Sequence, residues 1–200
     1  MKIELVNNTF KVIVFDLNGT ITGRVSEHPA HLDFRNNYIK SKLGKTLDAQ
    51  LPCSTTLALE ICGLSSVEYY KYRNSVLDWS LFHTNSELSS QGFQRLKELG
   101  FKLVLYTDCY GEQIKSTLKT LKMECVFDLI ISEEYNMKKP SPKAFKFIAD
   151  KFSCLPDDLL MVGNDYYKDL LPLKIIGGNI IQIESEQDLP KIFEIITKLN

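Results

Sequence analysis

Carboxylate, hydroxyl and amine side chains stand directly after apolar segments of this sequence or just before a predicted helix. The groups are Asp16-Leu17-Asn18-Gly19-Thr20, Thr107-Asp108, Lys138-Lys139-Pro140 and the segment from Gly163 to Asp169. A carboxylate such as Asp16 can attack phosphorus and form an acyl phosphate, which divides one difficult hydrolysis into two easier steps. Phosphoryl transfer otherwise depends on positioning and charge neutralisation, so the sequence predicts phosphoryl chemistry with Asp16 as the nucleophile.

The other polar residues can bind a cation and the phosphoryl oxygens. Mg²⁺ prefers oxygen ligands and keeps several waters. The candidate ligands are Asp16, Asp165 and Asp169. We expect Lys139 to neutralise the phosphate and Asp16 together, and Thr107 to donate its hydroxyl to a phosphoryl oxygen. Gly19 would allow the backbone to approach the substrate closely.

These residues need a scaffold that brings them together, and the pattern of the chain supplies one. From Ser89 onward, predicted helices alternate with apolar strands. The predicted strands are 12–15, 102–106, 127–131, 159–162 and 179–183, and the helices between and after them end with Leu189–Leu199. This alternation predicts an α/β fold with a Rossmann-like parallel sheet flanked by helices. Ligands bind at the carboxyl ends of the strands in such sheets, where the polar groups fall.

Residues 21–85 differ from the rest, because they are polar, lack β-branched runs and show helical spacing. We therefore expect residues 21–85 to form helices inserted between two parts of a core, 1–20 and 86–200. The aromatic residues Tyr69, Tyr70, Tyr72 and Trp79 are expected to pack among these helices or against the core.

The composition excludes several other classes of protein. The chain has 200 residues, a net charge of −1 and no long basic run, which argues against nucleic-acid binding. It has no apolar signal segment and no stretch long enough to cross a membrane. The five cysteines are scattered without a CxxC pair, so neither a zinc site nor a disulfide framework is expected. We expect a cytoplasmic protein; its oligomeric state stays open.

The chain resembles the haloacid dehalogenase superfamily over nearly its whole length. The residues that carry the resemblance are Asp16-Leu17-Asn18-Gly19-Thr20, the strand ending at Thr107, Lys139-Pro140-Ser141-Pro142, and Met161-Val162-Gly163 with the acidic residues that follow. They match the family's four motifs in order and spacing. The resemblance implies a Rossmann-like core, Mg²⁺ and usually phosphate-ester hydrolysis. It further implies that residues 21–85 form a small helical cap inserted after the first motif. It also implies that the backbone carbonyl of Asn18 can bind the metal.

Two positions depart from the family pattern. Family phosphatases have an aspartate where this chain has Asn18, and that aspartate protonates the leaving group and later activates water. An amide does neither, and general acid–base catalysis contributes about 10²–10⁴-fold. The family's Gly-Asp is Gly163-Asn164-Asp165 here, so Asn164 or Asp165 could bind the metal. A carboxylate favours Asp165.

Three hypotheses follow. The first is a Mg²⁺-dependent phosphatase of a small phosphorylated metabolite, slow because of Asn18. The second is a binding or regulatory protein on a catalytically weakened scaffold. The third is carbon–halogen or carbon–phosphorus hydrolysis on the same scaffold. Asp108 is a less certain site residue, because we prefer the prediction that it caps the following helix.

Overall fold

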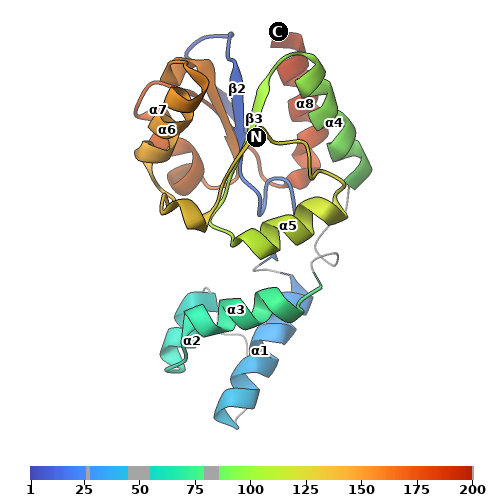
Figure 1. Cartoon of the computed structure of the whole chain (residues 1–200), viewed down its shortest axis with the longest axis vertical. Helices are drawn as coiled ribbons and strands as arrows, with labels where there is room; N and C mark the ends of the chain where they lie inside the picture. Colours follow the sequence, from blue (N-terminus) through green and yellow to red (C-terminus); the bar gives the residue numbers. More distant parts are fainter. Residues whose placement is uncertain (26–27, 45–54, 79–85, 200) are drawn as a thin grey trace.

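A six-stranded sheet with helices on both faces forms the larger part of the molecule (Figure 1). The computed structural model describes residues 1–25, 28–44, 55–78 and 86–199. In chain order the strands and α-helices are β1 (Lys2–Glu4), β2 (Val12–Phe15), α1 (Pro29–Leu43), α2 (Thr55–Ile61), α3 (Ser66–Val76), α4 (Ser86–Glu98), β3 (Lys102–Tyr106), α5 (Gly111–Thr120), β4 (Leu129–Ile131), α6 (Pro142–Phe152), β5 (Leu159–Gly163), α7 (Leu171–Lys174), β6 (Asn179–Gln182) and α8 (Leu189–Leu199). The predicted α/β fold is confirmed.

Strand β2, which ends next to Asp16, lies inside the sheet. The strand order is β1-β6-β5-β2-β3-β4. Ile13 pairs in parallel with Leu103 of β3 on one side and with Leu160 of β5 on the other. The carboxyl ends of these three strands therefore lie at the same edge of the sheet, as the site prediction requires.

The buried strands divide their side chains between two apolar clusters, because successive residues of a strand point to opposite faces. Ile13 and Phe15 pack in the cluster that includes residues of α4, α5 and α8. Val12 and Val14 pack in the cluster formed with α6 and α7. Since both faces are covered, the central strands are apolar without alternation.

Helices α1, α2 and α3, here called the helical segment, lie beyond the end of the sheet (Figure 1). They share a small buried core made of Tyr38, Ile39, Leu59 and Tyr69. Packing of Tyr69 inside this segment agrees with the sequence prediction, whereas Tyr72 is 50% exposed. Trp79 and the expected boundary at residue 85 lie outside the described residues.

The structure corrects several element boundaries. Strand β1 was not predicted; it is a three-residue edge strand that pairs antiparallel with β6. The strand expected from residue 127 begins at Leu129. Between β5 and β6 the chain forms a π-helical turn, Tyr166–Leu170, that continues into α7. Pro172 fits in the first turn of α7 because the N–H that it lacks has no partner there.

None of the helices within the described residues combines the length and apolar character that crossing a bilayer requires.

Candidate active site

A lysine joins two carboxylates at the carboxyl end of β2. The Nζ of Lys139 lies 2.5 Å from Oδ1 of Asp16 and 2.8 Å from Oδ1 of Asp169. The second oxygen of Asp16 accepts a hydrogen bond of 3.0 Å from the Thr20 hydroxyl. Asp16, Lys139 and Asp169 are all buried, and they come from three separate parts of the sequence. The structure thus brings together three of the residues that the sequence singled out.

The charges of this cluster depend on one another. Burial on its own would lower the pKa of Lys139, but the negative charges of Asp16 and Asp169 outweigh burial and raise that pKa. Burial, together with the nearby charge of Asp16, raises the pKa of the Asp169 carboxyl to about 6. Lys139 therefore stays protonated and holds a positive charge against the predicted nucleophile.

Two glycines allow the loops at this edge to approach each other. Gly19 has a φ of +86°, and a Cβ there would lie 2.8 Å from the side-chain nitrogen of Asn164. A Cβ on Gly163 would lie 2.6 Å from the Cβ of Asp169. We predicted that Gly19 makes room for a substrate; the side chain next to it in the structure belongs to Asn164.

The side chain of Asn18 is held by two partners. Its amide Nδ2 donates to the Sγ of Cys109 at 3.0 Å, and its Oδ1 accepts from the Thr22 hydroxyl at 3.3 Å. Cys109 is buried, and burial raises the pKa of its thiol. The backbone N–H of Cys109 in turn donates to Oγ1 of Thr107 at 3.2 Å. Asn18 and Thr107 are thus connected through Cys109.

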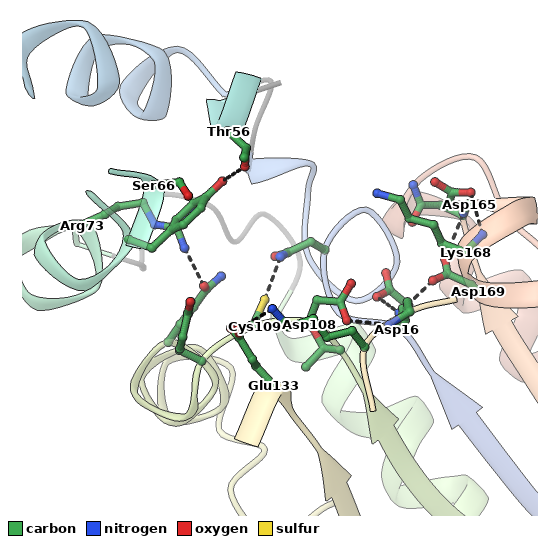
Figure 2. A pocket seen from close by; sticks show the side chains of 18 of the residues that line it. Asp16, Thr56, Ser66, Arg73, Asp108, Cys109, Glu133, Asp165, Lys168 and Asp169 are labelled. Atoms are coloured by element: carbon green, nitrogen blue, oxygen red, sulfur yellow. Dashed lines mark hydrogen bonds and ion pairs between the residues drawn. The ribbon is translucent and has the colours of Figure 1, made fainter. Parts of the chain in front are cut away.

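The expected cluster of three metal-binding carboxylates does not form. Oδ1 of Asp165 accepts hydrogen bonds of 3.0 Å from the backbone N–H groups of Tyr167 and Lys168, so this carboxylate caps the π-helical turn. Figure 2 shows it directed away from Asp16, whereas Asp169 points toward Asp16. Among the described residues, no three His, Cys, Asp or Glu side chains gather as a metal site.

Asn164, the alternative ligand, lies closer to the nucleophile. Its Oδ1 is 3.4 Å from the Thr20 hydroxyl, which also binds Asp16. The amide oxygen of Asn164 therefore lies beside Asp16, where the carboxylate of Asp165 was expected.

Asp108 does not cap the helix that follows it, contrary to our preferred prediction. Its Oδ1 accepts a hydrogen bond of 2.9 Å from the backbone N–H of Lys139. Tyr110 occupies the cap position of α5, and its side chain makes no capping bond. Asp108 thereby fixes the backbone from which the Lys139 amine reaches Asp16.

These residues line a pocket of about 610 Å³ between the sheet edge and the helical segment (Figure 2). Every candidate from the sequence lines it except Gly19: Asp16, Asn18, Thr107, Asp108, Lys139, Asn164, Asp165 and Asp169. The wall formed by the helical segment contains Thr56, Ser66, Val67, Tyr70 and Arg73.

Sequence reasoning missed Arg73 and Gln113, which meet across the pocket wall. The available signal for Arg73 was its spacing, since it follows Tyr69 by one helical turn and therefore lies on the same face of its helix. Nothing in the sequence paired it with Gln113.

Comparison with known proteins identifies the family of the chain. The model of the haloacid dehalogenase-like hydrolase family matches residues 13–177. A glyceraldehyde 3-phosphate phosphatase from Pyrococcus abyssi is 32% identical over 123 residues, which cover 50% of this chain and 51% of that protein. The chain thus spans about half the length of that relative. A phosphoglycolate phosphatase from Vibrio vulnificus is 23% identical over 190 residues, 86% of this chain and 83% of that protein.

A solved structure shares the fold. The crystal structure of an HAD phosphatase from Thermococcus onnurineus superposes with a TM-score of 0.66 at 20% identity, covering 92% of this chain and 97% of that one. The family match extends over most of the sequence and includes the strand that carries Asp16. The chain belongs to the haloacid dehalogenase-like hydrolase family.

Proposed function

We propose that this protein is a phosphatase that hydrolyses a small phosphate ester through a phosphoryl group carried on Asp16. The observation that carries the proposal is the position of Lys139, whose amine contacts both Asp16 and Asp169 in the wall of the pocket. The names of the two phosphatases that the chain resembles support the same reaction class.

The reaction needs two displacements at phosphorus. An oxygen of Asp16 attacks the phosphorus, and the ester oxygen leaves with the electron pair of the broken bond. Lys139 neutralises negative charge during this step, and the Thr107 hydroxyl, whose oxygen accepts from the Cys109 N–H, would donate its hydrogen to a phosphoryl oxygen. Water then attacks the phosphoryl group and releases phosphate and the free Asp16 carboxylate.

The oxygen atoms around Asp16 suit Mg²⁺. The carboxylates of Asp16 and Asp169, the Asn164 amide oxygen and the backbone carbonyl of Asn18 would hold the metal, and oxygen ligands of this kind are those that Mg²⁺ prefers. We favour Asn164 over Asp165, because Asp165 is engaged in capping and Asn164 shares the Thr20 hydroxyl with Asp16. When bound, Mg²⁺ would supply further neutralisation of the phosphoryl charge.

Asn18 makes this a slow phosphatase. The amide N–H is too weak an acid to transfer a proton to the departing oxygen, and the amide is too weak a base to take one from water. Its hydrogen bonds to Cys109 and Thr22 keep the side chain in place. The proton transfer is therefore missing because the side chain is an amide, and not because it is misplaced. Esters whose leaving oxygen needs little protonation, such as aryl phosphates, should react best.

We also propose that residues 21–85 act as a cap. Helices α2 and α3 contribute one wall of the pocket, so a bound ester would lie between them and Asp16. A wall of this kind excludes water and restricts the site to small substrates.

Hydrolysis of phenyl phosphate in the presence of Mg²⁺ tests the proposal. Asp16→Asn should lower kcat by at least about 10³-fold, as expected for loss of a nucleophile. Asn18→Asp should raise kcat by about 10²-fold or more, since it supplies an acid. Asn136→Asp, which makes the same charge change outside the residues lining the pocket, is the control. Activity that survives Asp16→Asn contradicts the proposal.

A protein that binds phenyl phosphate without hydrolysing it, in the native form and in Asn18→Asp alike, would instead be a binding protein on this scaffold. For the metal, Asn164→Ala should raise the Mg²⁺ concentration that half-activates the enzyme more than Asp165→Ala does. The reverse order would restore Asp165 as the ligand.

A further inference from the structure

Asp108 brings a carboxylate into the pocket from the strand next to the one that carries the nucleophile. It follows β3, which pairs in parallel with β2 so that Leu105 lies opposite Phe15. Neighbouring strands lie only about 4.8 Å apart, so the residues that follow these two strands border the same small space. Asp108 is exposed and lines the pocket together with Asp16. Figure 2 shows its side chain between those of Cys109 and Asp16.

One oxygen of the Asp108 carboxylate is bound, and the other faces no partner. Oδ1 accepts the hydrogen bond of 2.9 Å from the backbone N–H of Lys139, which fixes the direction of the side chain. For Oδ2, the part of the chain that the structure describes supplies neither a hydrogen bond nor an ion pair. An ionised carboxylate oxygen is an acceptor only, so Oδ2 can accept a hydrogen bond from a water molecule in the pocket.

The other acidic side chains that line the pocket beside the nucleophile are held differently. The Asp169 carboxylate contacts one lysine amine at 2.8 Å, and that of Glu133 contacts another at 2.7 Å. A positive neighbour favours the ionised form of a carboxyl group and so makes it a weaker base. Asp165 caps the π-helical turn and is directed away from the nucleophile (Figure 2). Asp108 is thus the carboxylate that is best placed to take a proton in this pocket.

The helical segment supplies no alternative base. Its described residues in the pocket wall include no carboxylate and no imidazole; they are Thr56, Ser66, Val67, Tyr70 and Arg73. His31 is buried within the segment, with its Nε2 3.3 Å from the Tyr69 hydroxyl, and it does not line this pocket. A base for chemistry at Asp16 must therefore come from the sheet side of the pocket.

We propose that Asp108 is the general base of the second displacement, in which water releases phosphate from Asp16. This inference rests on the proposed phosphatase function and assigns the proton of the attacking water. The water oxygen forms a bond to phosphorus while Oδ2 of Asp108 takes up a proton from that water. The bond between phosphorus and the Asp16 oxygen breaks, and its electron pair returns to the Asp16 carboxylate. Asp108, which is exposed, then passes the proton to solvent.

This role is compatible with the slow first displacement that Asn18 causes. Carboxylates that water can reach are ionised at neutral pH, so they accept a proton but have none to donate. Asp108 therefore assists the attack of water and does not replace the acid that the leaving oxygen lacks. Esters whose leaving oxygen needs a proton stay slow in the first step, whereas the release of phosphate from Asp16 is catalysed.

Burst kinetics with 4-nitrophenyl phosphate and Mg²⁺ measure the two displacements separately. The leaving 4-nitrophenolate needs little protonation, so its initial burst reports phosphorylation of Asp16 and its later steady rate reports the release of phosphate. Asp108→Asn keeps an oxygen for the Lys139 N–H and replaces Oδ2 by an amide nitrogen. We expect this variant to lower the steady rate by about 10²-fold, as loss of a general base predicts, with the rate of the burst unchanged. After acid quenching, mass spectrometry should find more phosphorylated Asp16 in the variant than in the native protein.

Asp188→Asn is the matched control. Oδ2 of Asp188 also accepts a hydrogen bond of 2.9 Å from a backbone N–H, that of Glu184, and Asp188 does not line the pocket. This control should leave both rates unchanged. If Asp108 acts only by holding the backbone of Lys139, the burst and the steady rate of Asp108→Asn should fall together, because Lys139 would neutralise charge in both displacements.

A second carboxylate provides a rescue experiment. Asn18→Asp, added to Asp108→Asn, supplies a base on the neighbouring strand and should restore the steady rate to at least the native value. A steady rate that stays low in the double variant would assign the loss to a misplaced Lys139 and overturn the inference.

Two further outcomes separate this inference from the proposed function. An unchanged steady rate in Asp108→Asn, or an equal fall of burst and steady rate, overturns the role of Asp108 while hydrolysis that depends on Asp16 leaves the phosphatase proposal standing. Absence of both the burst and the steady release, in the native protein and in Asn18→Asp alike, contradicts both proposals.

Discussion

The sheet domain and the helical segment are built in different ways. The sheet domain has two large apolar clusters, one on each face, and the central strand β2 contributes to both. The helical segment has a small core in which Tyr38, Ile39, Leu59 and Tyr69 are buried. It also buries charged or titratable side chains, among them His31, Arg35 and Arg73.

The two walls of the pocket therefore differ in how firmly their residues are held. Asp16, Thr107 and Asp169 follow strands whose registers are fixed by hydrogen-bonded neighbours on both sides or by a tight turn. Arg73 and Tyr70 stand on a helix that few buried apolar residues hold in place. The proposed catalytic groups are therefore rigidly positioned, and the pocket wall formed by the helical segment lies on the less extensively packed region.

The comparison predicts that truncating an aromatic side chain affects stability differently in the two regions. Phe93 is fully buried and contacts Phe15, Phe127 and Phe193, so Phe93→Ala should lower the free energy of unfolding of the whole molecule by about 3–5 kcal/mol. Tyr69→Ala should open the helical segment while the amides of β2 stay protected. Hydrogen exchange measures both effects. Loss of protection in β2 on Tyr69→Ala would show that the two regions unfold as one.

Acid should weaken the helical segment through His31. Burial, with the charges of Arg73 and Arg35, lowers the pKa of His31 to about 4, and its Nε2 lies 3.3 Å from the Tyr69 hydroxyl. Above pH 6.5 both the folded and the unfolded state hold a neutral imidazole. Below that pH the unfolded state takes up the proton first, so stability falls as the pH drops toward 4, by about 3 kcal/mol in total.

His31→Gln should remove this part of the acid sensitivity. The measurement is hydrogen exchange of α1 and α3 amides from pH 7 to pH 4. Acid opening of the same size in His31→Gln would assign the effect to another group.

The smallest expected effect on stability comes from the serine residues at the starts of α3 and α6. Ser65 Oγ accepts a hydrogen bond of 3.3 Å from the Glu68 N–H at the start of α3, whereas Ser141 precedes α6 without a side-chain capping bond. Ser65→Ala should lower stability by about 1 kcal/mol, and Ser141→Ala should have much less effect. Urea unfolding monitored separately for each region measures the difference. Equal losses would show that capping does not distinguish the two helices.

The sheet could be predicted from sequence because its central strands are continuous apolar runs between turn residues. Val12–Phe15 and Leu159–Val162 are short apolar runs of the kind found in parallel strands that are buried on both faces. Strand β1 escaped prediction because it is short and exposed, and pairing with β6 alone gives it order. Edge strands of this type carry little signal in their own residues.

The site could be predicted as a set of residues but not as a set of contacts. The motif order identified Asp16, Lys139 and Asp169, which the structure joins. The use of Asp165 was not predictable, because a carboxylate at that position can cap a helix start or face the nucleophile, and the choice depends on the local turn. The hydrogen bond between Arg73 and Gln113 joins residues 40 positions apart, so no local sequence pattern predicts it.

Strands β2 and β3 are hydrogen-bonded neighbours, although the helical segment and α4 separate them along the chain. The chain therefore leaves the sheet at the end of β2 and returns to the neighbouring strand through α4. Changing the length of such an insertion costs little, since each doubling of a flexible loop adds only about 0.6 kcal/mol of closure entropy. We expect that exchange of residues 21–85 for the corresponding part of a relative leaves Asp16 and Lys139 in place. Recombination at this junction would then produce enzymes with new substrates from an unchanged catalytic half.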